Sequence, residues 1–486
     1  MSLLWWMALG LQAVSFASIV LVGVALLGAS WRGALLAAAI VTPVPLFKVS
    51  AGAAGFIYLG DLLGILCLLG MALGWLRPVG DRSPGMRLLL LLALSSLVLL
   101  PGISTVAGFV TSPEGRSMKP GLLGVLRGLS YFLVFLLFMQ RARSERRPDS
   151  MVLIQCLAFW LIALCGLMQY AAGIDLDLWN EVRQLGASGG SFGGGFMGLY
   201  RGAVGAWGAG ILGAVPAAFA NRRLGAVLMP VVTVTIMAAM LAVGSRQGVL
   251  IGGVAFVIGL WLSVRSMPGG ARMGAFCRGV GGVALLCVLG LGIWSQVSSE
   301  RFGLYVTRRF ELLWEPELLM ERIMRRDWRL ATAWDNITGS SQVLMIGTGY
   351  GVEEHSGALA IVRHYYVDSE LFYTWQLGGT VLLLAYAGLL LMLRLELRGS
   401  LCPQDARAGI VRGAATAVLY AGMLLMYGHF FLLTTAAHQA PVAYWNWALL
   451  GLAVGLRRAE QSLPEPAPGD QVLQPLRGRR ALEQPC

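Results

Sequence analysis

Long apolar stretches alternate with short polar connections along almost the whole chain. A helix needs about 20 predominantly apolar residues to cross the hydrocarbon layer of a membrane, and runs of this kind recur throughout. They lie near residues 3–28, 33–47, 57–76, 86–103, 120–139, 150–172, 201–220, 224–243, 245–264, 279–295, 370–393, 410–433 and 436–456. The pattern predicts an all-α polytopic integral membrane protein with about 12–13 transmembrane helices.

Composition also favours lipid as the solvent of this chain. Of its 486 residues, 57% are hydrophobic and 13% are charged, and a soluble domain of that composition would expose large apolar patches to water. The formal net charge is +12, but the basic residues form short clusters between apolar runs, as topology signals do. The charge therefore does not indicate nucleic-acid binding. The cysteines lie mostly inside apolar runs, which predicts neither a disulfide framework nor a metal cluster.

Arginine clusters on every second connection set the predicted orientation. They lie within residues 77–87, 141–147, 222–223, 265–278, 394–412 and 457–458. By the positive-inside rule these connections are cytoplasmic. The opposite side then receives the longest connection, residues 296–369, as one large extracytoplasmic loop.

The spans and connections predict four regions. Residues 1–295 form an N-terminal bundle of transmembrane helices, 296–369 the large loop, and 370–456 the C-terminal transmembrane helices. Residues 457–486, rich in proline, glutamine and arginine, form a disordered cytoplasmic tail. The first run has no basic segment before it, which predicts a first span and no cleaved signal peptide.

A basic stripe lies within the large loop, at residues 321–329. Helical spacing puts its four arginines on one face and apolar side chains on the other, which predicts an amphipathic helix against the membrane. The arginines are Arg322, Arg325, Arg326 and Arg329. They either meet lipid headgroups or form a cradle for the phosphates of a substrate, for which guanidinium groups are well shaped.

Two ionisable residues lie inside apolar runs, a turn or two from the predicted outer surface. Asp61 is in the run 57–76 and Arg127 in the run 120–139. Ionisable groups at that depth are candidates for function, but these two could equally form a structural ion pair between helices. Arg201 and Arg246 begin their own predicted helices at the same surface, which predicts that several arginines converge on one outer-leaflet cavity.

The end of the large loop carries a glycine turn and then a group of titratable residues. The glycines of residues 347–351 permit a tight turn and close approach of the backbone to a ligand. The titratable residues are Glu353, Glu354, His355, His364, Asp368 and Glu370. They either transfer protons near neutral pH or only solvate the loop. Their spacing fits no common zinc motif, so we predict no metal.

Four elements follow one another in a familiar order. Residues 245–248, Ser-Arg-Gln-Gly, open a predicted helix, and the large loop follows two helices later. Within the loop, Arg329 and Trp334 precede the glycine turn, and Asp-Ser-Glu-Leu at 368–371 closes the loop before the glycine pair 378–379. Over about residues 200–395 this arrangement resembles the O-antigen ligase and O-antigen polymerase superfamily of bacterial envelope glycosyltransferases. Gly-Asp-Leu-Leu at 60–63 is a further similarity.

The resemblance implies a substrate and a location. The substrate is an oligosaccharide linked to undecaprenyl pyrophosphate, presented at the outer face of the bacterial inner (cytoplasmic) membrane. Membrane lipids, a flippase and a chain-length regulator of the same pathway are the implied partners, and no cofactor is implied.

It also implies roles for particular residues in a metal-independent glycosyltransferase. Arginines would neutralise the departing pyrophosphate, with Arg246, Arg326 and Arg329 first and Arg322, Arg325 and Arg201 beside them. His364, or second Asp368, would be the general base that activates an acceptor hydroxyl.

Three functions remain after these observations. The ligases of the superfamily usually close the loop with His-Asn, whereas Asp368 and Ser369 stand here, which favours a polymerase of lipid-linked repeat units. A ligase that transfers the glycan to another acceptor is the nearest alternative. A transporter or flippase of lipid-linked glycans is the alternative of a different class, but the sequence shows no internal repeat of the kind that such folds usually carry.

Overall fold

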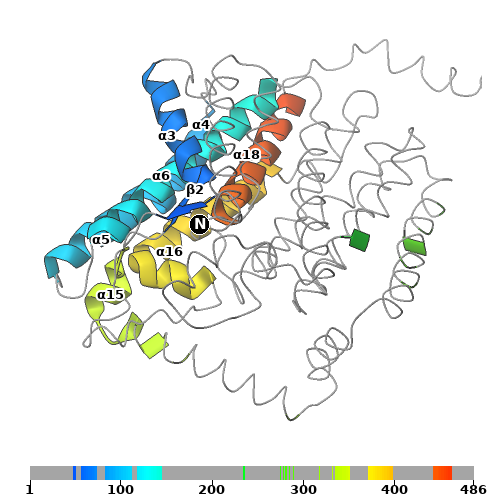
Figure 1. Ribbon diagram of the computed structural model, residues 1–486. Helices are drawn as coiled ribbons and strands as arrows, with labels where there is room; N and C mark the ends of the chain where they lie inside the picture. The colour runs from blue at the N-terminus through cyan, green and yellow to red at the C-terminus, as the bar shows by residue number, and fades with distance from the viewer. Residues whose placement is uncertain are drawn as a thin grey trace, which may run out of the picture.

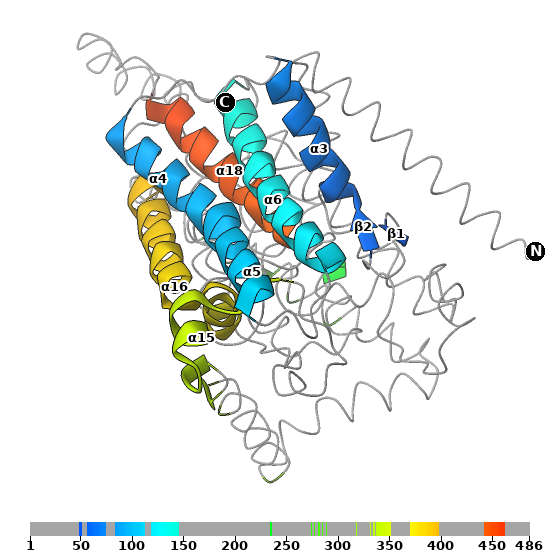
Figure 2. The same cartoon turned by 90° about the vertical axis from the view of Figure 1, so that its left-hand side faces the viewer.

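The structure is a computed structural model, and its elements are drawn in Figures 1 and 2. It describes residues 48–50, 56–73, 83–111, 118–144, 337–350, 370–397 and 442–461, and the isolated positions 234–235, 274, 277, 280–281, 284, 288, 317, 331 and 334–335. Its helices are α3 (Leu59–Ala72), α4 (Pro84–Leu94), η2 (Ser95–Leu99), α5 (Leu100–Thr111), α6 (Met118–Ser144), α15 (Ser341–Ile346), α16 (Glu370–Leu397) and α18 (Val442–Gln461). The described part is thus helical, as predicted, apart from one small pair of strands.

The two strands are β1 (Lys48–Ser50) and β2 (Phe56–Tyr58), which pair antiparallel with Val49 opposite Ile57. The sequence analysis did not predict them. β2 leads directly into α3, so the pair fixes the point at which that helix begins (Figure 2).

Three helical stretches among the described residues are long and apolar enough to cross a membrane: Pro84–Thr111, Gly121–Gln140 and Leu371–Leu397. They correspond to the predicted runs 86–103, 120–139 and 370–393, and this part of the prediction is confirmed. The total number of spans and the side on which each loop lies involve residues outside the described ranges. Helix α18 continues to Gln461, past the predicted start of the tail, and Arg458 in its last turn complements the negative end of the helix dipole.

Helix α6 is the centre of the described bundle. Helix α18 lies along one side of it, where Trp447 packs edge-on against Phe135 with ring centroids 6.1 Å apart. A side chain at Gly451 would overlap the carbonyl of Phe135, so the two backbones are in close contact. Small residues at such crossings are typical of helices that pack in lipid. Helix α3 packs on another side of α6, where a side chain at Gly64 would overlap Ser130.

The long stretch Pro84–Thr111 is not one regular helix. It begins with Ser83, whose hydroxyl accepts the backbone N–H of Met86, and it contains the π-helical turn η2 at its middle. At that turn the carbonyl of Leu97 points at Gly128 of α6, where a side chain would overlap it. The π turn itself is therefore in close contact with α6, and such turns occur often at functional sites.

Helix α16 is broken by its glycine pair. Gly378 has φ −134° and ψ 15°, and Gly379 has φ 66° and ψ −167°, neither of which is helical. Figure 2 shows the segment before the break nearly end-on, while the segment after it runs beside α4. The break therefore turns the chain from a direction across the bundle to a direction along it.

The helix ends form two groups. The ends that carry Arg87, Arg394 and Arg458 lie toward one end of the bundle, and the first residues of α3, α6, α16 and α18 lie toward the other, as Figure 2 shows. The second group is joined there by the last residues of α5 and by α15. The features described next all lie at this second end.

Candidate functional site

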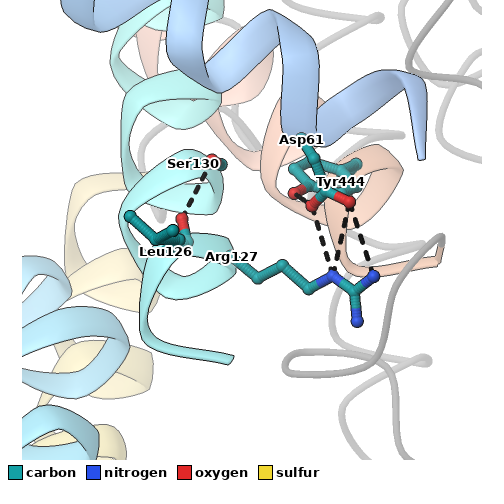
Figure 3. A network of polar contacts seen from close by, with 5 residues as sticks. All are labelled: Asp61, Leu126, Arg127, Ser130 and Tyr444. Carbon is teal, nitrogen blue, oxygen red and sulfur yellow. Dashed lines mark hydrogen bonds and ion pairs between the residues drawn. The ribbon is translucent and has the colours of Figure 1, made fainter. Parts of the chain in front are cut away.

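Two of the predicted site residues are described, and the structure brings them together. The Nε atom of Arg127 lies 3.2 Å from Oδ1 of Asp61, and its Nη2 atom lies 3.4 Å from Oδ2 (Figure 3). The other predicted site residues lie outside the described ranges: Arg201, Arg246, Arg322, Arg325, Arg326, Arg329, His364 and Asp368. Of the predicted site residues, Asp61 and Arg127 are thus the two that lie within the described ranges.

Local sequence explains why the carboxylate of Asp61 is held at this place. Asp61 is in the first turn of α3, where a negative charge is favoured by the helix dipole. It is only 6% exposed, and a carboxylate buried to that extent needs a cationic partner and hydrogen bonds. Arg127 on α6 supplies both, so the pair joins α3 to α6.

A third residue, Tyr444 of α18, completes the cluster. Its hydroxyl donates a hydrogen bond to Oδ1 of Asp61, and its ring packs edge-on against Tyr131 with centroids 4.6 Å apart. Sequence reasoning missed Tyr444 because it lies within the predicted run 436–456, where an uncharged tyrosine does not stand out as an ionisable residue does. Asp61, Arg127 and Tyr444, here called the polar cluster, hold three helices together (Figure 3). These contacts favour the structural interpretation of the pair.

The glycine turn predicted at 347–351 is described as far as Tyr350. It lies against the break in α16, where the N–H of Thr348 donates to the carbonyl of Gln376 at 2.7 Å and the N–H of Gly349 donates to that of Leu377 at 2.9 Å. A helix that stops leaves its last carbonyls without partners. The turn supplies partners for two of them and so stabilises the break.

The same turn is fastened to α5. The N–H of Tyr350 donates to the hydroxyl of Thr105 at 2.9 Å, and the hydroxyl of Ser104 donates to the carbonyl of Ile346 at 2.5 Å. Gly349 has φ 69°, and a side chain there would overlap the backbone of Thr105. Glycine is therefore required by both its conformation and its surroundings.

Helix α6 connects the turn to the polar cluster. The ring of Tyr350 covers Gly124, where any side chain would overlap it. Gly124 lies three residues before Arg127, which is about one turn of an α-helix. We call this region the junction: the polar cluster, the turn Gly347–Tyr350 and the break at Gly378 and Gly379. It unites parts of the sequence that are far apart along the chain.

No family model, curated protein or solved structure matches this chain. The similarity to the O-antigen ligase and polymerase superfamily therefore stays a prediction from the sequence. The geometry of the junction is an observation that does not depend on that prediction.

The described side chains of the junction are suited to holding helices and backbone in place. Within the ranges that the structure describes, no three side chains of His, Cys, Asp or Glu gather as they would around a metal ion. The carboxylate of Asp61 is engaged by an arginine and a tyrosine, which leaves it poorly placed to serve as a general base.

Proposed function

We propose that this protein polymerises oligosaccharide repeat units linked to undecaprenyl pyrophosphate at the outer face of the bacterial cytoplasmic membrane. The observation that carries the proposal is the junction itself. It brings together Gly-Asp-Leu-Leu at 60–63, the glycine turn and the glycine pair 378–379, three of the elements through which the sequence resembles the O-antigen ligase and polymerase superfamily. Separate motifs that meet in one place support a common function.

The bundle suits a substrate that stays in the membrane. Its apolar helices can span the bilayer, and the arginine-bearing helix ends lie away from the junction (Figure 2). By the positive-inside rule the junction then faces the outer side of the membrane. That is the side on which lipid-linked glycans await polymerisation in this proposal.

The junction also holds both ends of the connection that carries the proposed base. The chain enters residues 351–369 after Tyr350, whose N–H is bonded to Thr105, and it leaves them at the start of α16, whose carbonyls at 376 and 377 are bonded to the turn. The connection that contains His364 and Asp368 therefore begins after the turn and ends at the first residue of α16.

The chemistry follows from the substrate. An oxygen of an acceptor hydroxyl attacks the anomeric carbon of the donor sugar, its proton passes to His364, and the bond to the pyrophosphate oxygen breaks. Arg246, Arg326 and Arg329 neutralise the charge that develops on the leaving pyrophosphate. The polar cluster holds α3, α6 and α18 together beside the connection that carries the proposed base.

A transporter of lipid-linked glycans is the second candidate, because discontinuous helices such as α16 are common in transporters. In transporters the backbone groups of such a break bind the substrate. In this protein two carbonyls at the break accept hydrogen bonds from the turn. A break closed by the protein's own backbone fits a fixed support better than a transport site.

Complementation tests the polymerase. In a strain that lacks the gene, Arg246→Ala, Arg329→Ala and His364→Ala are each expected to leave single repeat units where the wild type gives a ladder on a glycan gel. The matched controls are Arg222→Ala, from a predicted cytoplasmic cluster, and His429→Ala, from the predicted run 410–433. Both should restore the ladder at equal membrane abundance. If the deletion strain instead keeps long glycan chains on the carrier lipid, the protein is a ligase. If it keeps repeat units at the inner face of the membrane, the protein is a transporter. A deletion strain whose glycans match those of the wild type would contradict all three functions.

A further inference from the structure

We infer that α15 and the glycine turn form a re-entrant element that dips into the outer part of the membrane, with Met345 and Ile346 in contact with lipid acyl chains. The inference concerns how the protein sits in the bilayer and does not depend on the proposed reaction. It rests on the depth, the exposed surface and the hydrogen bonding of residues that the structure describes.

Two contacts set the direction of α15. The side-chain amide of Gln342 donates to the hydroxyl of Thr111 at 2.7 Å, and the carbonyl of Ile346 accepts from the hydroxyl of Ser104 at 2.5 Å. α15 therefore starts beside the last residue of α5 and ends beside a residue seven positions earlier. At 1.5 Å per residue, that is about 10 Å further into the bundle.

The length of the neighbouring span sets the depth. Arg87 is the charged residue near the start of Pro84–Thr111 and marks one membrane surface. Ser104 follows Arg87 by seventeen residues, or about 26 Å, which is less than the hydrocarbon thickness of about 30 Å. Thr111 lies about 36 Å from Arg87, beyond that thickness. α15 thus crosses from the interface into the apolar layer.

The exposed surface at this depth is apolar. Met345 and Ile346 are 50% and 39% exposed, and Val106 of α5 is 65% exposed. The sequence of α15, Ser-Gln-Val-Leu-Met-Ile, contains no charged residue. Exposing such side chains to water would cost about 25 cal/mol for each Å² of apolar area, whereas lipid removes that cost.

Backbone hydrogen bonding permits the element to enter lipid. Backbone that is not regular helix is tolerated at membrane depth only where the protein itself supplies the partners. The carbonyl of Leu344 accepts from the side chains of Trp375 and Thr380, at 3.3 and 2.7 Å, and that of Ile346 accepts from Ser104. The N–H groups of Thr348 and Gly349 are bonded to α16, so these four backbone groups at the tip have partners within the protein.

Trp334 marks the outer limit of the element. It is 49% exposed and packs edge-on against Trp375, with ring centroids 5.5 Å apart. Half-exposed tryptophans are typical of the interface between headgroups and acyl chains. The order from Trp334 to Ile346 therefore runs from the interface into the acyl region.

Nitroxide labels at single cysteines test this placement. The seven native cysteines are replaced, and labels are attached to Met345→Cys and Ile346→Cys in phospholipid vesicles, with Val106→Cys as the lipid-facing control and Ser340→Cys as the control at the outer end of α15. Labels at 345 and 346 are expected to be several-fold more accessible to oxygen than to a water-soluble nickel chelate, as at 106, with the opposite preference at 340.

Two results would overturn the inference. Labels at 345 and 346 that respond to the nickel chelate as the label at 340 does would place them in water, and labels protected from both reagents would mean that a second copy or another protein covers them. A benzophenone amino acid at position 345 of the chain with its native cysteines gives a second readout. Illumination is expected to yield a phospholipid adduct by mass spectrometry, and a protein adduct or none would contradict the lipid contact.

Discussion

Replacing Arg127 with leucine is expected to destabilise the folded protein by about 3–5 kcal/mol, because the carboxylate of Asp61 would remain buried without its cationic partner. The leucine itself suits the surroundings of α6, so the loss comes from the uncompensated charge. Reversible unfolding in mixed detergent micelles, followed by circular dichroism, measures the change. Arg87→Leu, which replaces an exposed arginine on α4, is the control and should change stability by no more than about 0.5 kcal/mol.

A double-mutant cycle separates the pair from its parts. In the background Asp61→Asn, which removes the charge, Arg127→Leu is expected to cost far less than it does alone. Tyr444→Phe, which removes one hydrogen bond to a charged acceptor, should cost about 1.5–3 kcal/mol in the wild type. If Arg127→Leu were no more harmful than Arg87→Leu, the polar cluster would not hold the three helices together.

Substitution of Gly379 by alanine is the second change expected to be severe, with a loss of about 2–5 kcal/mol. The residue has φ 66°, a conformation that disfavours any side chain, and an added Cβ would overlap the backbone of Met345. The turn would have to leave the break in α16, and two helix carbonyls would lose their partners. The loss of stability is measured by thermal unfolding, and the release of the turn is measured as lost protection of the N–H of Thr348 from hydrogen exchange.

Gly388→Ala is the matched control in the same helix. A Cβ at that position would make ordinary contacts of 3.6 Å with the methyl groups of Leu92. Because alanine is favoured over glycine within a helix, this variant should be neutral or more stable by about 0.5–1 kcal/mol. Equal losses for the two variants would mean that the break is not specifically supported by the turn.

Much of the described fold could be predicted from hydrophobic runs, because a membrane helix must be apolar along its whole length. The run 86–103 predicted the stretch that the structure extends to Pro84–Thr111. Its π turn was not predicted, because Ser95 and Ser96 are too few polar residues to interrupt an apolar run, and the turn lies in contact with α6. The strands β1 and β2 were missed because three residues are too few for an alternating pattern to stand out.

The sequence predicted the charged residues of the site, but it did not predict which distant residues contact them. Asp61 and Arg127 stood out because ionisable residues are rare inside apolar runs. Nothing in the sequence joins them to Tyr444, which lies more than three hundred positions later. Likewise the glycines of residues 347–351 indicated a turn, but the break at Gly378 and Gly379 was not predicted within the run 370–393. The hydrogen bonds from the turn to α16 exist only in the folded chain.

Purified protein in phospholipid nanodiscs, supplied with repeat units on undecaprenyl pyrophosphate and a metal chelator, gives the most direct test of the proposed polymerase. Mass spectrometry of the carrier-linked products is expected to show multiples of the repeat unit, with one undecaprenyl pyrophosphate released for each new linkage. The variant His364→Ala is expected to give neither the longer chains nor the released pyrophosphate. Single repeat units that persist unchanged on their carrier, beside protein that is folded and monodisperse, would contradict the proposed function.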